Sequence, residues 1–211
     1  VLGVSKDVVT TPFSYCATSH SVVWEGCNPV FADVLPSDLC IDPQKVEEAI
    51  TENTQAILAT HVYGNPCDVY QLQKIADKHN LKLIYDAAHA FGASVDGKSL
   101  LSFGDISTCS FHATKVFHTV EGGAVITNND EYAWLLDRYR SFGHIGDDYL
   151  TIGINGKNSE FHAAMGLVNL PKVSEIIAAR KAIFDIYDAE LNWSKLGSPV
   201  LSLNTEKNYA Y

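Results

Sequence analysis

Apolar runs of strand length alternate with helical patterns through most of the chain, and this order constrains the fold more than any other feature. Strands that alternate with helices along a sequence are typical of α/β folds with a largely parallel sheet. We therefore expect a layered α/β fold whose sheet is mostly parallel. The predicted strands are residues 8–11, 30–34, 56–62, 81–85, 106–111 and 124–127.

Several of the predicted helices carry clear start signals. Asp42 can cap a helix that has Pro43 at its first position, where the missing N–H costs nothing. Asp68 can cap a helix that ends near residue 79, and Asn128 or Asn129 can start another. Further predictions are a helix over 15–25, a surface loop over 147–158, and a helical stretch over 160–191 that Pro171 kinks or splits.

The charge balance and the cysteines exclude several classes of protein. With 25 acidic and 15 basic residues the formal net charge is −10, which disfavours binding to nucleic acid and to anionic lipid surfaces. The five cysteines are odd in number and form neither a CxxC pair nor a metal-ligand cluster. No apolar stretch approaches the roughly 20 residues of a membrane-spanning helix, and the first residues lack a signal-peptide pattern. We expect a cytoplasmic protein with reduced thiols, without a metal site or membrane contact.

The sequence LKLIYDAAHAFGA carries the first candidate for chemistry. Its apolar strand delivers Asp86 at the carboxyl end, where ligands collect in open α/β sheets. From the residues alone, Asp86 is as well explained by capping the next turn as by touching a ligand. His89, taken alone, is better explained as a packing residue.

The second candidate is SFHATKVFHTVEGGAVIT, in which the single lysine Lys115 lies in a loop bounded by apolar residues. Such surroundings can favour the neutral amine that imine chemistry requires. The simpler interpretation, an exposed loop lysine, is the commoner case. The glycines that follow fit neither a dinucleotide-binding nor a P-loop pattern and indicate a tight turn into a strand.

The order of these two signals resembles a known family. An acid at one strand end is followed about thirty residues later by SFHATK, and matching blocks extend from TTPFSYCAT and PVFADV through HVYGNPCD to EGGAVITN and GINGKNSEFHAAMG. The chain thereby resembles the DegT/DnrJ/EryC1/StrS family of sugar aminotransferases, pyridoxal 5′-phosphate (PLP) enzymes of fold type I. The resemblance implies the large domain of that fold, an α/β three-layer sandwich with a mostly parallel sheet.

The resemblance also implies roles for individual residues. Lys115 holds the cofactor aldehyde as an imine and shuttles a proton, and Asp86 pairs with the pyridinium nitrogen, which keeps the ring an electron sink. The remaining implied cofactor contacts are His89 on the hydroxyl side of the ring, Tyr15 stacked on its face, Ser110 at its phosphate, and Asn155 at the phosphate of the neighbouring subunit.

As an expectation from the resemblance, the chain is a homodimeric aminotransferase that passes an amino group from glutamate to a nucleotide-linked keto sugar. Some members of the family carry histidine at the lysine position and are dehydratases, so Lys115 favours amino transfer. A PLP enzyme of different reaction type and a catalytically silent dimerising or regulatory module remain the alternatives.

The ends of the chain resemble cuts rather than natural boundaries, so we expect a fragment. The family's upstream Gly-Thr phosphate-binding segment is absent from the sequence, as is most of its C-terminal small domain. The expected domains are a PLP-binding large domain over 1–170, followed by a linking helix and the start of a truncated small domain over 171–211.

Overall fold

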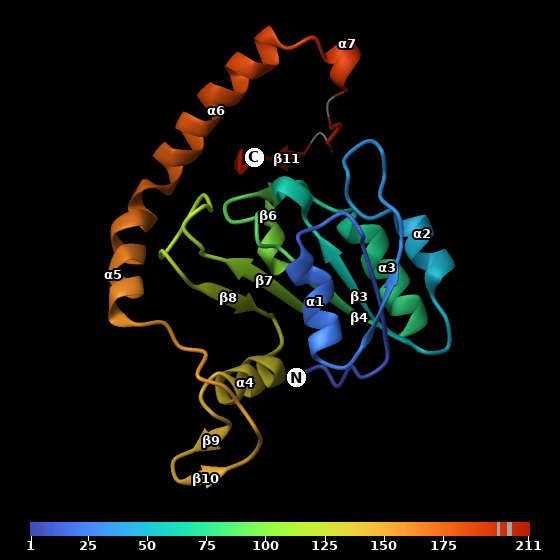
Figure 1. Ribbon diagram of the computed structural model, residues 1–211, viewed down its shortest axis with the longest axis vertical. Helices are drawn as coiled ribbons and strands as arrows, with labels where there is room; N and C mark the ends of the chain where they lie inside the picture. Colours follow the sequence, from blue (N-terminus) through green and yellow to red (C-terminus); the bar gives the residue numbers. More distant parts are fainter. Residues whose placement is uncertain (198, 202–203) are drawn as a thin grey trace.

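A computed structural model describes residues 1–197, 199–201 and 204–211. Its centre is a six-stranded sheet in the order β2-β1-β3-β4-β7-β8, in which only β8 runs antiparallel to its neighbour (Figure 1). The expectation of an α/β fold with a mostly parallel sheet is therefore confirmed. The six strands are β1 (Asp7–Thr10), β2 (Asn28–Phe31), β3 (Thr54–Thr60), β4 (Lys82–Asp86), β7 (Ile106–Ser110) and β8 (Gly123–Ile126).

Helices cover both faces of this sheet. Successive side chains of a strand point to opposite faces, and here both sets are apolar and packed beneath helices. Ile57 and Ala59 of β3 point into the larger core, which is closed by α2 (Pro43–Ala49) and α3 (Val69–His79). Ala56 and Leu58 of the same strand point into a smaller core with Val22 of α1 (Cys16–Trp24). The layers are thus helix, sheet and helix (Figure 1).

The predicted helix starts are confirmed in detail. Asp42 accepts a hydrogen bond from the Gln44 N–H, with Pro43 at the first helical position. Asp68 caps α3 by accepting from the Gln71 N–H. Of the two candidate asparagines, Asn129 caps α4 (Asp130–Tyr139) by accepting from the Tyr132 N–H.

The predicted helix over 160–191 is divided. It consists of α5 (Glu160–Asn169), a 3₁₀ turn η3 (Leu170–Lys172) that contains Pro171, and α6 (Val173–Glu190). The division falls at Pro171 because a proline has no N–H to continue the helical bonding. Figure 1 shows α5 and α6, in orange, along one side of the sheet, followed by the short α7 (Trp193–Leu196).

Some elements differ from the sequence-based expectations. The strand expected over 30–34 begins and ends earlier, as β2, and Val34 instead forms an isolated bridge with Ile41. The loop expected over 147–158 contains β10 (Asp148–Tyr149), which pairs with β9 (His144–Ile145). The 3₁₀ turns η1 (Val62–Gly64) and η2 (Leu100–Ser102) complete the connections.

A small second sheet was not foreseen from the sequence. The hairpin of β5 (Ser94–Val95) and β6 (Lys98–Ser99) takes up β11 (Thr205–Glu206) as a third strand. The last residues of the chain are thereby brought back beside the turn that follows β4. Among the described residues, no helix has both the length and the apolar character needed to cross a bilayer.

Candidate active site

The candidate site lies at the carboxyl edge of the parallel strands. Residue pairing places Thr60 of β3 beside Asp86 of β4, and Asp86 beside Thr108 of β7. The turn after β4 carries His89, and the loop after β7 carries Lys115. These side chains line a cavity of about 1260 Å³, together with Ser110 and Tyr15. Five of the six residues that the sequence proposed for the site are therefore brought together.

Asp86 is held in one orientation by two hydrogen bonds. The Thr18 hydroxyl donates to one carboxylate oxygen at 2.6 Å, and the Ala88 N–H donates to the other at 3.1 Å. The Thr18 hydroxyl also lies 2.7 Å from that of Ser14, which in turn accepts from Thr60 at 3.3 Å. Hydrogen bonds to an ionised group are the stronger kind, so this short network fixes the negative charge at the cavity wall.

Sequence reasoning missed Thr18. It lies in the first turn of α1, and no local pattern marks it, because its partner Asp86 is 68 positions away in the sequence. Thr18 is buried, and its hydroxyl faces the same cavity.

His89 is an uncharged histidine at neutral pH. Burial lowers its pKa, the nearby Lys115 ammonium lowers it further, and Asp86 opposes the shift. Its Nδ1 atom is buried and has no hydrogen-bond partner among the described residues. The ring packs against Tyr211, with 4.6 Å between the ring centroids. One ring nitrogen is thus left for a polar group that the protein does not supply.

Lys115 provides the amine of the cavity. It is half-buried and is followed by the buried Val116 and Phe117. Its backbone N–H donates to the His112 carbonyl at 2.9 Å, which forms a tight turn, and its Nζ lies 6.0 Å from the centre of the Tyr211 ring. In the part of the chain that the structure describes, Lys115 is the one lysine that lines the cavity.

Cys109, one residue before Ser110, is not a competing nucleophile. Burial raises the pKa of its thiol to about 12, with Asp86 adding to the shift and Lys115 opposing it. A thiol is reactive as the thiolate, so Cys109 is inert at neutral pH. The ionisable side chains that the sequence proposed for the cavity are an amine, a carboxylate and a neutral imidazole, those of Lys115, Asp86 and His89.

Ser110 and Tyr15 occupy the rim of the site. Ser110 ends β7, and its hydroxyl accepts from the His112 N–H at 3.3 Å. Tyr15 is the residue before α1, and 78% of its surface is exposed. An aromatic ring and a hydroxyl in these places can contact a flat, phosphate-bearing ligand.

Asn155 lies outside the cavity. It is exposed, accepts a hydrogen bond from Lys157 Nζ at 2.9 Å, and forms an isolated bridge with Ser141. The structure therefore does not join Asn155 to the other five residues within one chain. No cluster of metal-ligating side chains is present among the described residues.

Known proteins are similar to this chain in both sequence and fold. The chain is 52% identical to a dTDP-4-amino-4,6-dideoxy-D-glucose transaminase of Shigella dysenteriae, over 85% of this chain and 49% of that protein. Its fold matches the crystal structure of DesI solved with its TDP-sugar product, with a TM-score of 0.89 and 36% identity over 99% of this chain and 54% of that one.

A second solved structure is the PLP form of a putative sugar aminotransferase, Spr1654 of Streptococcus pneumoniae, with a TM-score of 0.87 and 25% identity. This match covers 99% of the present chain and 60% of that one. The chain thus spans about half the length of the relatives it matches. The family model of the DegT/DnrJ/EryC1/StrS aminotransferases matches residues 1–210, and the chain belongs to this family.

Proposed function

We propose that this chain carries the cofactor site of a PLP-dependent aminotransferase that acts on a nucleotide-linked keto sugar. The observation that carries the proposal is the convergence of Lys115, Asp86, His89, Ser110 and Tyr15 on one cavity. These residues come from three separate segments, so their meeting depends on the fold. Two of the named relatives carry dTDP- or TDP-linked sugars in their names, which makes a dTDP-linked 4-keto-6-deoxy sugar the first substrate to test.

The side chains present fit the cofactor. A pyridine ring needs an anion at its nitrogen and a hydrogen-bond partner at its hydroxyl, and the oriented carboxylate of Asp86 and the unpartnered Nδ1 of His89 offer both. When bound, PLP supplies an aldehyde that accepts amino groups and a ring that stabilises negative charge at the neighbouring carbon. Tyr15 would cover the face of the ring, and Ser110 would donate to its phosphate.

Asp86 and His89 set the charge around the ring. Because Thr18 and Ala88 hold both oxygens of Asp86, the carboxylate is oriented before the cofactor arrives. It keeps the proton on the pyridine nitrogen. His89 stays neutral beside Lys115, so it adds no positive charge that would compete with that proton.

Lys115 has two tasks. Its Nζ would hold the cofactor covalently at the aldehyde carbon, with loss of water, and would be freed when the nitrogen of an amino donor replaced it. The freed amine would then act as the base that accepts the proton from the donor carbon and as the acid that returns a proton to the former aldehyde carbon of the cofactor. The half-buried position limits the access of water to Nζ during these transfers.

The partners and domains are part of the proposal. Glutamate is the amino donor, and the protein works in the cytoplasm as a homodimer in which Asn155 contacts the cofactor phosphate of the neighbouring subunit. The position of Asn155 outside its own cavity supports this role. Residues 1–170 form the cofactor-binding domain, and residues 171–211 form the linking helix and the start of the small domain.

Trapping with borohydride tests the proposal directly. The purified chain is mixed with PLP, reduced, digested and analysed by mass spectrometry, and the spectrum is recorded before reduction. We expect a yellow species and a phosphopyridoxyl group on Lys115. Lys115→Ala should show neither, whereas Lys98→Ala, an exposed lysine away from the cavity, should behave like the wild type.

Amino transfer is then measured as the release of 2-oxoglutarate from glutamate in the presence of the keto sugar. PLP on Lys115 without any transfer would favour a PLP enzyme of another reaction type. An absence of labelling at Lys115 would overturn the assignment of the site.

A further inference from the structure

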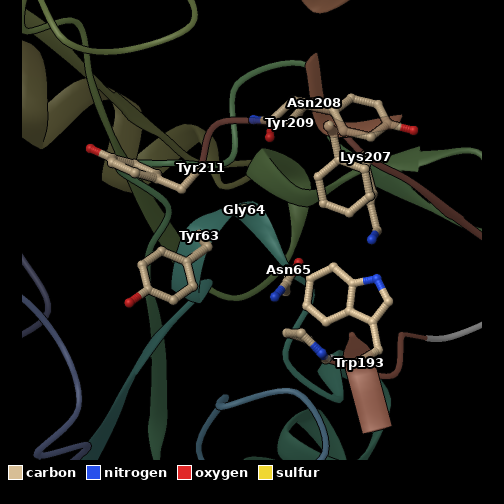
Figure 2. A pocket seen from close by; sticks show the side chains of 10 residues that line it. Tyr63, Gly64, Asn65, Trp193, Lys207, Asn208, Tyr209 and Tyr211 are labelled. Carbon is tan, nitrogen blue, oxygen red and sulfur yellow. The ribbon is translucent and has the colours of Figure 1, made fainter. Parts of the chain in front are cut away.

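The last residues of the chain return to the wall of the cavity. After β11 has paired with β5, residues 207–211 run past the turn that carries His89 and end with Tyr211 on the cavity surface. Figure 2 shows this segment from close by, with Tyr211 opposite Tyr63 and with Gly64 between the segments. The Tyr63 and Tyr211 ring centroids are 5.7 Å apart.

Asn208 is the residue that ties this segment to the turn. Only 1% of its surface is exposed. Its Nδ2 donates to the backbone carbonyls of His89, at 2.6 Å, and Phe91, at 2.9 Å, while its Oδ1 accepts from the Ala210 N–H at 3.1 Å. Both amide hydrogens and the oxygen are therefore used, which a buried amide requires.

Gly64 closes the other side of this contact. Its φ of +82° suits glycine, and a Cβ there would lie 2.6 Å from Asn208 Oδ1 and 2.8 Å from the His89 carbonyl oxygen. Three segments that are distant in sequence thus meet without spare room. A side chain at position 64 would press on both Asn208 and the His89 carbonyl, while Asn208 holds that carbonyl with one hydrogen bond and the Phe91 carbonyl with the other.

The same amide also places the ring that packs on His89. Through its bond from Ala210 N–H, Asn208 fixes the backbone next to Tyr211, whose ring lies against the His89 imidazole. Lys115 Nζ lies 6.0 Å from the centre of the same Tyr211 ring. One side chain therefore constrains both the turn below His89 and the aromatic wall beside it.

We propose that Asn208 is a positioning residue of the cofactor site: it orients His89, and with it the hydroxyl side of the bound ring, without touching the ligand. The proposal rests on the proposed function for its effect on PLP. Its geometric part concerns the protein alone and is measurable without the cofactor. Removal of the Asn208 amide leaves the carbonyl oxygens of His89 and Phe91 without their donor, and the turn that carries His89 is then free to shift.

The experiment compares Asn208→Ala and the isosteric Asn208→Asp with a control from the same segment. Asn204→Ala is the control, since Asn204 Nδ2 donates at 2.6 Å to Asp96 in the β5–β6 hairpin, away from the cavity. Two quantities are measured for each protein. They are the NMR signal of the His89 ring without cofactor, assigned by its loss in His89→Gln, and the dissociation constant of PLP from an absorbance titration.

We expect both Asn208 variants to lose the ring-current shift that Tyr211 imposes on the His89 signal. We also expect them to bind PLP roughly 10- to 100-fold more weakly, because small misplacements of a positioned group have effects of this size. Asn204→Ala should keep the His89 signal and stay within about twofold of the wild-type affinity. A thermal unfolding curve shows which variants are folded, and Asn208→Ser, which keeps a small neutral polar side chain, serves if neither Asn208→Ala nor Asn208→Asp folds.

A folded Asn208 variant with an unchanged His89 signal overturns the proposal, even if its melting temperature has fallen. Equal losses in Asn204→Ala overturn it as well, because the effect then belongs to the whole segment. If the wild-type chain binds no PLP but the His89 signal moves only in the Asn208 variants, the positioning role holds and the proposed function fails.

Discussion

At the scale of single residues, the Thr18 hydroxyl controls the orientation of the Asp86 carboxylate. The 2.6 Å hydrogen bond joins two residues that are 68 positions apart in the sequence. Thr18→Val keeps the shape of the side chain and removes the donor. We expect PLP to bind about tenfold more weakly, the size of one lost hydrogen bond to a charged group.

The measurement is an absorbance titration with PLP. Ser19→Ala is the matched control, because Ser19 lies on the same helix and its hydroxyl bonds only to the Cys16 carbonyl. Wild-type affinity in Thr18→Val would show that Asp86 needs no such partner.

His61 couples the stability of the fold to pH. It is fully buried, stacks on Tyr85 with 4.6 Å between ring centroids, and accepts the Cys67 N–H at Nδ1. Burial lowers the pKa of His61 to about 3. Between pH 6.5 and 3, the His61 imidazole is therefore protonated in the unfolded chain but stays neutral in the folded chain. The free energy of unfolding must therefore fall as the pH drops from 6.5 toward 3, by about 1.4 kcal/mol per pH unit from this group.

Urea unfolding at pH 7, 6 and 5 measures this slope. His61→Gln, which retains an acceptor for the Cys67 N–H, should lose it, and the exposed His20→Gln should retain it. An equal slope in all three proteins would assign the pH dependence to other groups.

The residues that carry chemistry were predictable to different degrees. Asp86 ends a strand and Lys115 lies in the loop that follows another, and both positions are visible in the sequence. Thr18 and Asn208 act through partners 68 and 119 positions away, and no local pattern encodes such a distance. The state of His89 likewise depends on burial and on the neighbouring Lys115, which the fold alone brings near.

At the scale of elements, the helix caps make separate contributions to stability. Asp68 caps α3 through the Gln71 N–H. Asp68→Ala leaves that donor without its partner and should lower the free energy of unfolding by about 1 kcal/mol. Asp77→Ala is the control within the same helix, since among the described residues the Asp77 side chain bonds only to the exposed Gln73 side chain, and it should change stability by less than about 0.5 kcal/mol.

Urea unfolding at pH 7 compares the two variants. Equal changes in the free energy of unfolding for Asp68→Ala and Asp77→Ala would mean that the Asp68 cap does not stabilise α3 more than an ordinary surface residue does.

The elements were predicted best where local signals were strong. Asp42, Asp68 and Asn129 mark their helices by chemistry that acts within three residues. The β5–β6 hairpin had a usable signal that was overlooked. Asp96 and Gly97 have φ values of 51° and 71°, and Asp-Gly is a preferred pair for such a two-residue turn. β11 had none, because two residues that join a distant hairpin leave no periodic pattern.

At the scale of the whole molecule, a long apolar surface is exposed along α5. Phe161 is 87% exposed and Leu167 is 74% exposed. Exposed large apolar side chains gathered on one helix are typical of an interface, and the proposed homodimer would cover them. Sedimentation velocity should give a species of twice the 23.1 kDa chain mass.

Leu167→Asp places a charge on this surface and should shift the species to the single-chain mass. Val200→Asp is the control, an equally polar change at another exposed apolar residue. A wild-type chain that sediments as a monomer at micromolar concentration would contradict the homodimer.

The long reach of Asn208 also has a consequence for synthesis on the ribosome. A nascent chain that has emerged as far as Lys115 already contains every other residue proposed to touch the cofactor from within the same chain. Its His89 turn nevertheless lacks the amide that holds it, because that amide is 119 residues further on. Contacts of such separation form late in folding. If Asn208 positions the cofactor site as proposed, nascent chains that end before Asn208 should bind the cofactor more weakly than chains that contain it, because their His89 turn lacks this hydrogen bond.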